Sequence, residues 1–570
     1  MHNESRVSRR SFLGKAIAAG AASASVAALS QSAAPAASTA HETSLLDILR
    51  IPDRVTAFEG LSQSLAMTRS QRSWQASGIE VEFQGDGKQN SVFISSPEHN
   101  LTHVHLRWSI DVSERLRCLG DHWERSYGDL AWRGIVPERV MPWYFLAWDG
   151  VACHGYGVKT GAAALCFWQV DGDGVSLWLN VSNGGEGVQL GSRRLHAATI
   201  VSRPATSGES AIESARAFCG VMCDKPRLPS SPIYGSNDWY YAYGKNSAEQ
   251  TLRDADLMAE LSSGLAVRPF TVIDDGWRDT SRFPDMGAVA AEIRKRKVRP
   301  GIWIRPLIAP ANTAENLLLS GARFGSQKQR ASEGAYDPTI PDALKIITAK
   351  AREVVDFGFE LVKHDYSTYD LLGRWGSEMG ASPTTPGWHL HDRSRTNAEV
   401  IRDLYLALRR AVGERTLLLG CNTVGHLGAG IFESQRTGDD TSGQHWERTR
   451  KMGVNTLAFR LAQDRTFFAL DPDCVGITPA IPWEQNRQWL DVIARSGAAL
   501  FVSPDAAATG PEQKKAIAEA FRMAAEGGAR ISPEDWLDST SPERWSRGAG
   551  TTAQLRYRWC EPGGADPFAT

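Results

Sequence analysis

The sequence predicts an α/β fold: a (β/α)8 TIM barrel that follows an N-terminal β-sandwich and precedes a small C-terminal β segment. Between residues 45 and 225, short segments alternate apolar and polar residues, as half-buried strands do. Between residues 231 and 525, short apolar runs alternate with helical patterns, and between residues 530 and 570 strand-like patterns return. The chain has 570 residues, of which 42% are hydrophobic and 22% charged, so it is globular and long enough for more than one core.

The first 40 residues predict an export signal rather than part of the fold. The segment "SRRSFLGK" (residues 8–15) precedes an Ala-rich apolar run from Ala16 to Leu29, and small residues continue to Ala40. These are the parts of a signal peptide, and the pattern S-R-R-x-F-L-x-K is the signature of twin-arginine (Tat) export. We therefore expect a bacterial protein that the Tat export machinery delivers to the periplasm or beyond as a secreted protein. No later apolar stretch is long enough to span a bilayer.

The composition argues against several classes of function. The formal net charge is −2 and no Lys/Arg-rich run stands out beyond the N-terminus, so nothing supports nucleic-acid binding. Eight cysteines in 570 residues are too few for a disulfide scaffold. Cys219 and Cys223 have no second pair nearby, so we expect free thiols rather than a zinc site. The 19 tryptophans suit stacking on sugar rings, although large core residues explain them equally well.

The segment from residue 45 to 225 predicts the sandwich because its strands have a period of two. Apolar residues alternate with glutamates in "GIEVEFQGD" (residues 78–86), and three later segments repeat the pattern. His103 and His105 would point to the same face of one strand. Without a third ligand, we expect a solvated or hydrogen-bonded pair rather than a metal site. The Pro- and Ser-rich "DKPRLPSSPIYG" (residues 224–235) marks the domain boundary.

Apolar runs separated by helical patterns predict the barrel. The runs cover residues 232–239, 268–277, 299–308, 359–366, 416–422, 430–440, 466–474 and 498–505. One helix is expected over residues 246–261, beginning with a capping box of Ser247 and Gln250, and another over residues 342–358, ending at Gly358 as the C′ residue. Such β-then-α units, repeated over about 280 residues, match the (β/α)8 barrel. A doubly wound open sheet is the alternative, but the chain has no Gly-rich nucleotide turn.

Charged residues follow several of these runs, at the C-terminal strand ends where barrels carry their active sites. They are Asp274 and Asp275 after the second run, Lys363 and Asp365 after the fourth, Arg436, Asp439 and Asp440 after the sixth, and Asp471 and Asp473 after the seventh. A single such aspartate would be read as a helix cap or a turn residue. Carboxylates that meet at one barrel mouth repel each other, so we expect a function that offsets this cost.

Paired carboxylates at a barrel mouth indicate glycoside hydrolysis, in which one carboxylate attacks the sugar and a carboxylic acid protonates the leaving group. Aspartate clusters also bind Mg²⁺ or Ca²⁺, which is the alternative. Lys363 and Arg436 argue against a metal, because cations in the mouth suit sugar hydroxyls and carboxylates better. We therefore expect neither a metal nor a cofactor.

At these motifs the sequence resembles a known family. The segments "IDDGWR", "VKHDY", "CNTVG", "RTGDD" and "DPDC", in this order on successive strands, are similar to those of the α-galactosidases of glycoside hydrolase clan D, and of family 36 in particular. The sandwich, the barrel and "PEDWLDSTSPERW" near the C-terminus agree with family 36, so the resemblance covers most of the chain after residue 45. It implies an enzyme that hydrolyses terminal α-linked galactose from an oligosaccharide or polysaccharide by retaining double displacement.

The resemblance also implies roles for individual residues. Asp365 matches the nucleophile and Asp439 the general acid/base. Asp440 is the alternative acid/base, because the spacing R-x-x-x-D from Arg436 selects it. The expected sugar-binding residues are Asp274 and Asp275 at O4 and O6, Lys363 at the ring hydroxyls, Cys421 beside C2, Arg436 near O2, and Trp239 and Trp277 as walls of the subsite.

Two departures from the family pattern bear on the substrate. "KHDYS" stands where family 36 usually reads K-W-D-M-N, and "CNTVGHLG" lacks the arginine of C-x-x-G-G-x-R. A second expectation is therefore an α-N-acetylgalactosaminidase or a galactosyl-transferring enzyme of the same clan, since small residues near Cys421 would leave room for an N-acetyl group. A third, from another class, is a non-catalytic sugar-binding protein, and the intact carboxylate pair argues against it.

Overall fold

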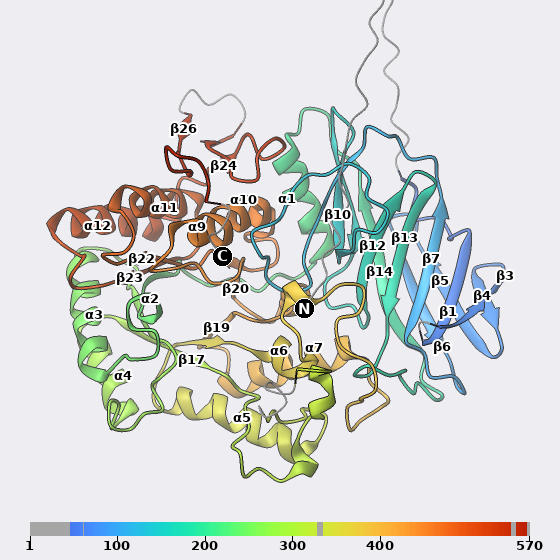
Figure 1. Ribbon diagram of the computed structural model, residues 1–570, viewed down its shortest axis with the longest axis horizontal. Coiled ribbons are helices and arrows are strands. Elements are labelled where there is room, and N and C mark those ends of the chain that lie inside the picture. Colours follow the sequence, from blue (N-terminus) through green and yellow to red (C-terminus); the bar gives the residue numbers. More distant parts are fainter. Residues whose placement is uncertain (1–45, 61, 328–333, 549–553, 567–570) are drawn as a thin grey trace, which may run out of the picture. The chain divides into compact units, whose positions relative to one another are not determined.

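The computed structural model describes residues 46–60, 62–327, 334–548 and 554–566 (Figure 1). The expected export signal, residues 1–40, lies outside the described residues and stays a prediction. The elements follow the expected order: antiparallel strands come first, the parallel α/β part follows, and a short antiparallel sheet comes last.

The first part of the chain forms two antiparallel sheets. One has the strand order β2-β1-β7-β13-β12-β9, and the other has the order β3-β4-β5-β6-β14-β11-β10-β8. Their strands are β1 (Arg54–Gly60), β2 (Gln63–Ala66), β3 (Thr68–Ser70), β4 (Ser73–Ala76), β5 (Ile79–Gly85), β6 (Gln89–Ser95), β7 (His103–Ser109), β8 (Arg117–Gly120), β9 (Met141–Pro142), β10 (Tyr144–Trp148), β11 (Cys153–Val158), β12 (Leu165–Asp171), β13 (Gly174–Asn180) and β14 (Leu195–Arg203). In β5, Ile79, Val81 and Phe83 are buried while the residues between them are only partly buried, which is the predicted period of two.

One helix in this part was not predicted by the alternating pattern: α1 (Ala211–Met222). The Ser210 hydroxyl accepts a hydrogen bond from the Glu213 N–H, and the Glu213 carboxylate accepts one from the Ser210 N–H, so a complete capping box starts the helix. Phe218 packs directly over Gly155 in β11, where a Cβ atom would overlap its ring. The helix can therefore pack on the sheet because the strand carries glycine at that point.

The two histidines of β7 are held within the protein. His103 Nε2 lies 3.1 Å from the Asn180 side-chain nitrogen, and the His105 ring stacks on Trp178 with centroids 4.1 Å apart. Burial lowers the pKa of both imidazoles to about 4, so both rings are neutral at neutral pH. A hydrogen-bond contact thus holds the His103 ring and stacking holds the His105 ring, while His103 Nδ1 and His105 Nε2 have no hydrogen-bond partner within the described residues.

The second part of the chain is a parallel sheet with the order β21-β20-β19-β18-β17-β16-β15-β23-β22. Its strands are β15 (Tyr234–Asn237), β16 (Phe270–Ile273), β17 (Arg299–Ile304), β18 (Leu361–His364), β19 (Leu417–Gly420), β20 (Ser434–Arg436), β21 (Ala469–Asp471), β22 (Cys474–Ile477) and β23 (Leu500–Pro504). Although β21 and β22 stand at opposite ends of this order, only Pro472 and Asp473 separate them in the chain. They are therefore two halves of one barrel position, and the sheet closes into the predicted eight-position barrel. Each predicted run contains a strand, but β22 was not predicted as a separate one.

Helices surround the parallel strands (Figure 1). They are α2 (Trp239–Ala242), α3 (Ala248–Leu261), α4 (Met286–Lys295), α5 (Pro341–Asp356), α6 (Ser367–Leu372), α7 (Asn397–Val412), α8 (Gly425–Gly428), α9 (Trp446–Thr449), α10 (Thr456–Arg460), α11 (Trp483–Ser496) and α12 (Pro511–Ala525), with short turns η1 (Glu315–Leu317), η2 (Gly321–Phe324), η4 (Gly376–Glu378) and η6 (Leu461–Gln463) and a π-helix, η5 (Arg450–Asn455). Strands such as β16, β18 and β23 are buried along their whole length, because helices cover one face and the barrel interior the other.

Two predicted helix ends can be compared with the structure. At the start of α3, the Ser247 hydroxyl accepts a hydrogen bond from the Gln250 N–H at 3.3 Å. Gln250 Oε1 has no partner within the described residues, so the predicted capping box is wrong in its second half and only the serine cap forms. Gly358 follows α5 with a φ of +98°, so it is the C′ residue that the sequence predicts.

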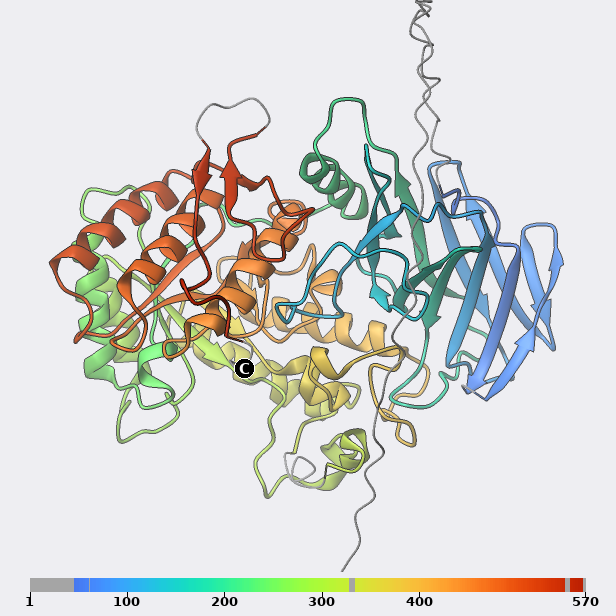
Figure 2. The same cartoon turned by 45° about the horizontal axis from the view of Figure 1, so that its top comes forward.

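The last part of the chain forms the predicted small β segment. Its strands are β24 (Ser532–Pro533), β25 (Arg544–Ser546) and β26 (Leu555–Arg556). This sheet, red in Figure 2, connects to α11 where the Tyr557 hydroxyl donates to Asp491 Oδ2 at 2.8 Å. Among the helices that the structure describes, none combines the length and the apolar character that a membrane span requires.

Candidate active site

The alternation of side chains along the strands delivers polar groups to the barrel mouth. Inside the barrel, the following side chains belong to one apolar cluster: Phe270, Val272, Leu361 and Leu419. Side chains two residues apart on a strand share a face. The faces that begin with these apolar residues therefore continue to Asp274 after β16, Lys363 in β18 and Cys421 after β19. The inward faces of these strands therefore carry apolar side chains in the barrel core and polar side chains at the barrel mouth.

Asp274 and Lys363 form a buried ion pair. The Lys363 Nζ lies 2.7 Å from Asp274 Oδ2, and the Asn237 side-chain amide donates to the same oxygen at 2.7 Å. Burial lowers the pKa of Lys363, but the nearby acidic groups, Asp274 first among them, together outweigh burial and raise the pKa well above its usual value. The Asp274 N–H donates to Asp238 Oδ1 at 2.8 Å. Both backbone and side chain of Asp274 are thus fixed before any sugar binds.

Asp365 follows β18 and accepts three hydrogen bonds. The Trp303 indole N–H donates to Oδ2 at 2.9 Å, and the backbone N–H groups of Tyr366 and Asn422 donate to Oδ1 at 2.7 and 3.0 Å. Burial raises the pKa of Asp365, but nearby cations, Arg125 first among them, and the Trp303 hydrogen bond outweigh burial, and the pKa is lowered. The carboxylate is therefore ionised at neutral pH, as a nucleophile must be.

Arg436, at the end of β20, is buried and held by Asp473. Its Nη2 donates to Asp473 Oδ2 at 2.7 Å and to Asp440 Oδ1 at 3.2 Å, while Nη1 lies 3.4 Å from Cys421 Sγ. Asp473 has a φ of 74°, in the left-handed region, at the break between β21 and β22. The Thr441 N–H donates to the same Asp473 oxygen at 2.8 Å. The interruption of the seventh strand thus supplies the carboxylate that orients Arg436.

Asp439 and Asp440 are adjacent in the chain but have different contacts. Both Asp439 oxygens are engaged, because Arg125 Nη2 lies 2.7 Å from Oδ1 and Arg448 Nη2 lies 2.9 Å from Oδ2. Asp440 uses one oxygen: Oδ1 lies 3.2 Å from Arg436 and 3.5 Å from Arg125, and within the described residues Oδ2 accepts no hydrogen bond. The Asp440 side chain is 39% exposed and the Asp439 side chain 19%. Asp440 is therefore the more accessible of the two carboxylates.

Three of the expected sugar-binding residues have different surroundings. Asp275 is exposed, one residue beyond the buried Asp274. Trp239 is partly buried and meets Tyr243 edge to face, with ring centroids 5.7 Å apart. Trp277 is buried, and its indole N–H donates to the Trp303 carbonyl at 2.8 Å. Trp277 thus contacts the residue that holds Asp365, in addition to any role as a wall of the subsite.

Several residues of the site were not identified from the sequence, among them Glu124, Arg125, Trp303 and Asn422. Glu124 and Arg125 belong to the sandwich part of the chain, where the strand-end rule for barrels does not apply. Trp303 lies inside the predicted strand at residues 299–308, where its residue type predicts only an apolar core residue. Asn422 acts through its backbone N–H, which the residue type does not reveal.

A cavity of about 320 Å³ opens between the carboxylates of Asp365, Asp439 and Asp440. It is lined by Arg125, Tyr127, Asp365, Tyr366, Trp375, Ser377, Asp439 and Asp440. Trp375 stacks on Tyr369 with ring centroids 4.4 Å apart and lies 5.3 Å from the Tyr366 ring. The cavity thus combines aromatic rings with a few charged groups, which is a common composition of small-molecule binding sites.

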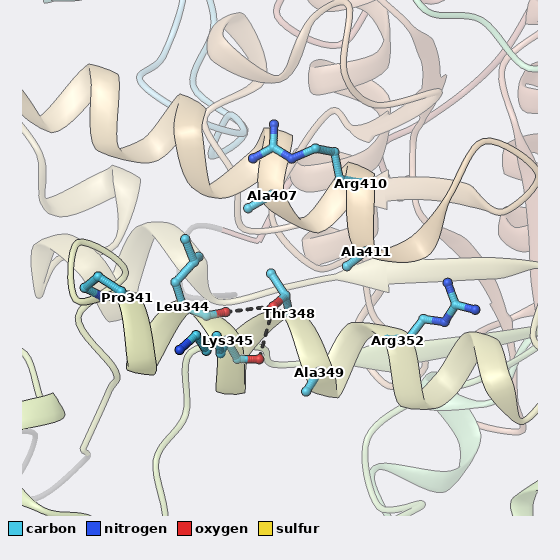
Figure 3. Close-up of a pocket in the computed structure, with 9 residues that line it drawn as sticks. All are labelled: Pro341, Leu344, Lys345, Thr348, Ala349, Arg352, Ala407, Arg410 and Ala411. Atoms are coloured by element: carbon cyan, nitrogen blue, oxygen red, sulfur yellow. Dashed lines mark hydrogen bonds between the residues drawn. The ribbon is translucent and has the colours of Figure 1, made fainter.

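A larger cavity, of about 690 Å³, lies elsewhere, between α5 and α7 (Figure 3). Its lining comes from the sides of two helices and includes Leu344, Thr348, Ala407 and Ala411. The Thr348 hydroxyl is turned to its own helix, where it donates to the Leu344 carbonyl at 2.8 Å. None of the strand-end carboxylates lines this cavity, so the smaller one is the candidate active site.

Among the described residues, no three His, Cys, Asp or Glu side chains are grouped so that they could hold a metal ion. The carboxylates of the mouth are neutralised by cations instead: Lys363 pairs with Asp274, and Arg436 pairs with Asp473. In these two pairs the positive charge that balances each buried carboxylate comes from a lysine or arginine side chain.

Comparison with solved structures identifies proteins with the same fold. The structure is similar to an α-galactosidase from Thermus thermophilus in complex with p-nitrophenyl α-D-galactopyranoside, with a TM-score of 0.55 and 16% identity over 88% of this chain and 99% of that chain. It is also similar to a family 36 α-galactosidase from Geobacillus stearothermophilus in complex with 1-deoxygalactonojirimycin, with a TM-score of 0.55 and 12% identity over 84% of this chain and 74% of that chain.

A third similar structure is an α-galactosidase from Lactobacillus brevis, with a TM-score of 0.54 and 12% identity over 86% of this chain and 76% of that chain. No protein-family model and no curated protein sequence matches this chain. The resemblance to family 36 α-galactosidases predicted from the sequence is thus confirmed for the fold.

Proposed function

We propose that the protein is a retaining α-galactosidase that removes terminal α-linked galactose by double displacement. The observation that carries the proposal is one cavity that holds an ionised aspartate, Asp365, together with two further carboxylates, Asp439 and Asp440. The likeness in fold to α-galactosidases that bind p-nitrophenyl α-D-galactopyranoside and stachyose supports it.

In the first step, Asp365 attacks the anomeric carbon, the bond from that carbon to the leaving oxygen breaks, and the acid gives its proton to that oxygen. A galactosyl ester of Asp365 forms. In the second step, the same acid, now ionised, takes a proton from water, the water attacks the anomeric carbon, and Asp365 leaves. Two inversions give net retention of the α configuration.

The contacts favour Asp440 over Asp439 as the acid/base. Both oxygens of Asp439 are paired with arginines, so its proton transfer would first break an ion pair. Asp440 has one oxygen without a hydrogen bond from the described residues and is more exposed. Its spacing from Arg436 is also the R-x-x-x-D spacing noted in the sequence. We therefore assign the proton transfer to Asp440. Asp439 holds Arg125 and Arg448 in place by ion pairs.

The charge of Asp440 should change through the cycle. Burial raises its pKa, but the Arg436 and Arg125 guanidinium groups outweigh burial and lower the pKa to about 2 without a sugar. A sugar in the cavity excludes water and disfavours the ionised form, so the pKa rises towards what an acid needs. Esterification of Asp365 then removes a negative charge nearby, which lowers the pKa again and suits the second step.

Recognition of galactose would rest on the buried pair of Asp274 and Lys363. A carboxylate fixed by Asn237 and Lys363 can accept a hydrogen bond from the axial O4 hydroxyl. A sugar without that hydroxyl would leave the charged group less well satisfied, at a cost of roughly 1–3 kcal/mol.

An α-N-acetylgalactosaminidase is less well supported by the contacts at Cys421. Arg436 and Arg125 nitrogens lie 3.4 and 3.7 Å from Cys421 Sγ, so guanidinium groups fill space that the sequence left open for an N-acetyl group. Galactosyl transfer would use the same first step, with a sugar hydroxyl in place of water.

A screen with p-nitrophenyl α-glycosides tests the proposal. We expect hydrolysis of the α-galactoside, slow or no hydrolysis of the α-N-acetylgalactosaminide, and α-galactose as the first product by NMR. A 2-deoxy-2-fluoro galactosyl inactivator should label Asp365. No turnover of any α-galactoside, or β-galactose as the first product, would refute a retaining α-galactosidase. Galactoside binding without turnover by the unmodified protein would indicate the non-catalytic sugar-binding alternative.

We also propose Tat-dependent export to the periplasm or beyond, motivated by the arginine pair Arg9 and Arg10. Changing both to lysine should leave precursor in the cytoplasm of an expressing bacterium. Normal accumulation of the mature double variant in the periplasm would contradict a Tat signal.

A further inference from the structure

A segment of the sandwich part, residues 121–128, reaches the end of the sixth barrel strand. The Ser126 N–H donates to the Thr437 carbonyl at 2.9 Å, and the Asp439 N–H donates to the Ser126 carbonyl at 2.9 Å. These two bonds form a parallel β-bridge between Ser126 and Gly438. The segment is thus hydrogen-bonded to the residues next to the candidate acid/base.

Arg460 of α10 fixes this segment to the barrel. It is buried, and its guanidinium donates to the Glu124 carbonyl at 2.6 Å, to the Thr437 carbonyl at 3.0 Å and to Asp121 Oδ1 at 2.8 Å. One arginine therefore holds the segment and the end of the sixth strand together. The position of the segment relative to the carboxylates is set by several buried contacts.

Arg125 is the residue of this segment whose side chain reaches the carboxylates of the candidate active site. It is only 5% exposed, and its guanidinium lies 2.7 Å from Asp439, 3.5 Å from Asp440 and 3.7 Å from Cys421 Sγ. It therefore contacts both carboxylates of the doublet and the residue expected beside C2 of the sugar. Its neighbour Glu124 accepts from the Asn422 side chain at 2.5 Å, and the backbone N–H of Asn422 donates to Asp365.

We propose that Arg125 is a positioning residue of this glycosidase site, which joins Asp439 and Asp440 and fixes the acid/base for proton transfer, so that the sandwich supplies part of the barrel's catalytic machinery. The inference rests on the proposed function and deepens it. Arg125 acts through the carboxylates.

The charges around Asp440 indicate what Arg125 contributes. The cations that face Asp440 are Arg436 of β20, Arg125, Lys363 of β18 and Arg448 of α9. The acidic groups near it are Asp365, Tyr240 and Tyr366, with Asp439 on the same cavity. Arg436 is already paired with Asp473, and Lys363 with Asp274. Among the described residues, Arg125 is the cation with guanidinium nitrogens close to both carboxylates of the doublet, 2.7 Å from Asp439 and 3.5 Å from Asp440.

Removal of Arg125 should therefore shift the pH dependence in a defined direction. Its positive charge favours the ionised forms of Asp440 and Asp365. Without it both carboxyl groups hold their protons to higher pH. The alkaline limb of kcat, where the acid of the enzyme–substrate complex loses its proton, should move up, and the acidic limb of kcat/KM, where the nucleophile of the free enzyme gains one, should move up as well.

The test compares Arg125→Ala and Arg125→Lys in the full-length protein. We expect kcat/KM for a galactosyl disaccharide to fall roughly 100-fold in Arg125→Ala, with a smaller loss for an aryl galactoside whose leaving group needs no proton. Guanidinium at millimolar concentration should restore part of the lost rate. Arg125→Lys should keep the wild-type pH limbs but lose rate, because an ammonium cannot bridge both carboxylates.

The matched control is Asp121→Asn, which removes the ion pair with Arg460 but leaves every contact of Arg125. It should loosen the segment and keep the pH limbs of the wild type. If Arg125→Ala keeps those limbs too, or if Asp121→Asn shifts them equally, Arg125 only anchors the segment and the proposal is overturned.

One measurement does not depend on turnover. In protein labelled with ¹³C at the aspartate carboxyl carbons, the Asp440 resonance, identified by its loss in Asp440→Asn, should titrate at higher pH in Arg125→Ala. An unchanged titration would overturn the role of Arg125 even in an active enzyme. A shifted titration in a protein that hydrolyses no α-galactoside would support the electrostatic link and refute the proposed function.

Discussion

Trp303 links Asp365 to Trp277: its indole N–H donates to Asp365 Oδ2 at 2.9 Å, and its carbonyl accepts the Trp277 indole N–H at 2.8 Å. Trp303 thus holds one oxygen of the candidate nucleophile, and Trp277 holds Trp303. The other oxygen, Oδ1, accepts two backbone N–H groups. An attacking carboxylate needs its rotation restricted in this way, because a near-attack geometry lowers the entropic part of the barrier.

Replacing Trp303 by phenylalanine should raise the pKa of Asp365, because a hydrogen bond to the ionised form is lost. The nucleophile acts when ionised, so activity is lost as pH falls through its pKa, and the acidic limb of kcat/KM should move to higher pH. A hydrogen bond to a charged group contributes about 1.5–3 kcal/mol, so kcat/KM should fall about 10- to 150-fold. Trp277→Phe is the control, since it leaves the bond to Asp365 in place. An unmoved acidic limb in Trp303→Phe would contradict the assignment of Asp365.

The choice between Asp439 and Asp440 can be decided by leaving-group dependence. If Asp440 is the acid/base, Asp440→Ala should hydrolyse poor leaving groups very slowly but still react with activated aryl galactosides, and azide should restore turnover by attacking the galactosyl ester in place of water, which gives α-galactosyl azide. A roughly 10²–10⁴-fold loss on poor leaving groups is expected. Asp439→Ala should keep a normal dependence on the leaving-group pKa. Azide rescue in Asp439→Ala instead would assign the role to Asp439, as the resemblance to family 36 implies.

Lys363→Met should destabilise the protein, because it leaves Asp274 as a buried carboxylate without its cation. Breaking a buried pair in this way costs about 3–5 kcal/mol of the free energy of unfolding. The double variant Lys363→Met/Asp274→Asn should recover much of that stability but not the affinity for galactose. Denaturant unfolding and the KM for an aryl α-galactoside measure the two effects. Equal stability of the wild type and Lys363→Met would mean that the pair is weaker than its 2.7 Å distance implies.

Asp238 should make stability depend on pH. Burial, followed by the charge of Asp274, raises its pKa to about 8 in the folded protein. Between about pH 4 and 8 the folded protein holds a proton that the unfolded chain has lost, so the free energy of unfolding falls as pH rises, by at most about 1.4 kcal/mol per pH unit. In Asp238→Asn this contribution disappears, and the amide can donate to Asn246 Oδ1, which lacks a partner within the described residues.

Unfolding of the wild type and Asp238→Asn at pH 5 and pH 8 measures this difference. The variant should gain stability relative to the wild type as the pH rises. The free energy of unfolding of the variant minus that of the wild type should therefore increase from pH 5 to pH 8. If this difference stays constant or decreases, Asp238 is ionised in the folded protein.

The strand-end residues could be predicted because their chemistry follows from local rules. A buried apolar strand that ends in Lys363 and Asp365 carries its own signal, and the two-residue alternation decides which side chains face the barrel interior. The same rule places Asp274 and Cys421 on the inner faces of their strands. Beyond the strand end the alternation no longer holds, which is why Asp439 and Asp440 could not be distinguished without their arginine partners.

Other parts of the site depend on contacts that no local pattern contains. Arg125 and Glu124 come from a segment more than 290 residues away from Asp440 and Asn422 in the chain. The break between β21 and β22, which turns Asp473 towards Arg436, follows from a left-handed backbone conformation at a non-glycine residue. The capping box at Gln250 is the opposite case. The sequence contains the local pattern, but the hydrogen bond that the Gln250 side chain should accept does not form within the described residues.

The bridge between Ser126 and Gly438 also bears on when the proposed active site would be completed during synthesis. The segment that carries Arg125 leaves the ribosome early, but Arg460, which holds it, follows more than 330 residues later. Contacts between such distant parts of a chain form late in folding, because a long loop must close first. A nascent chain can therefore complete its sandwich long before it has a working acid/base. On refolding from denaturant, intrinsic tryptophan fluorescence should recover before turnover does.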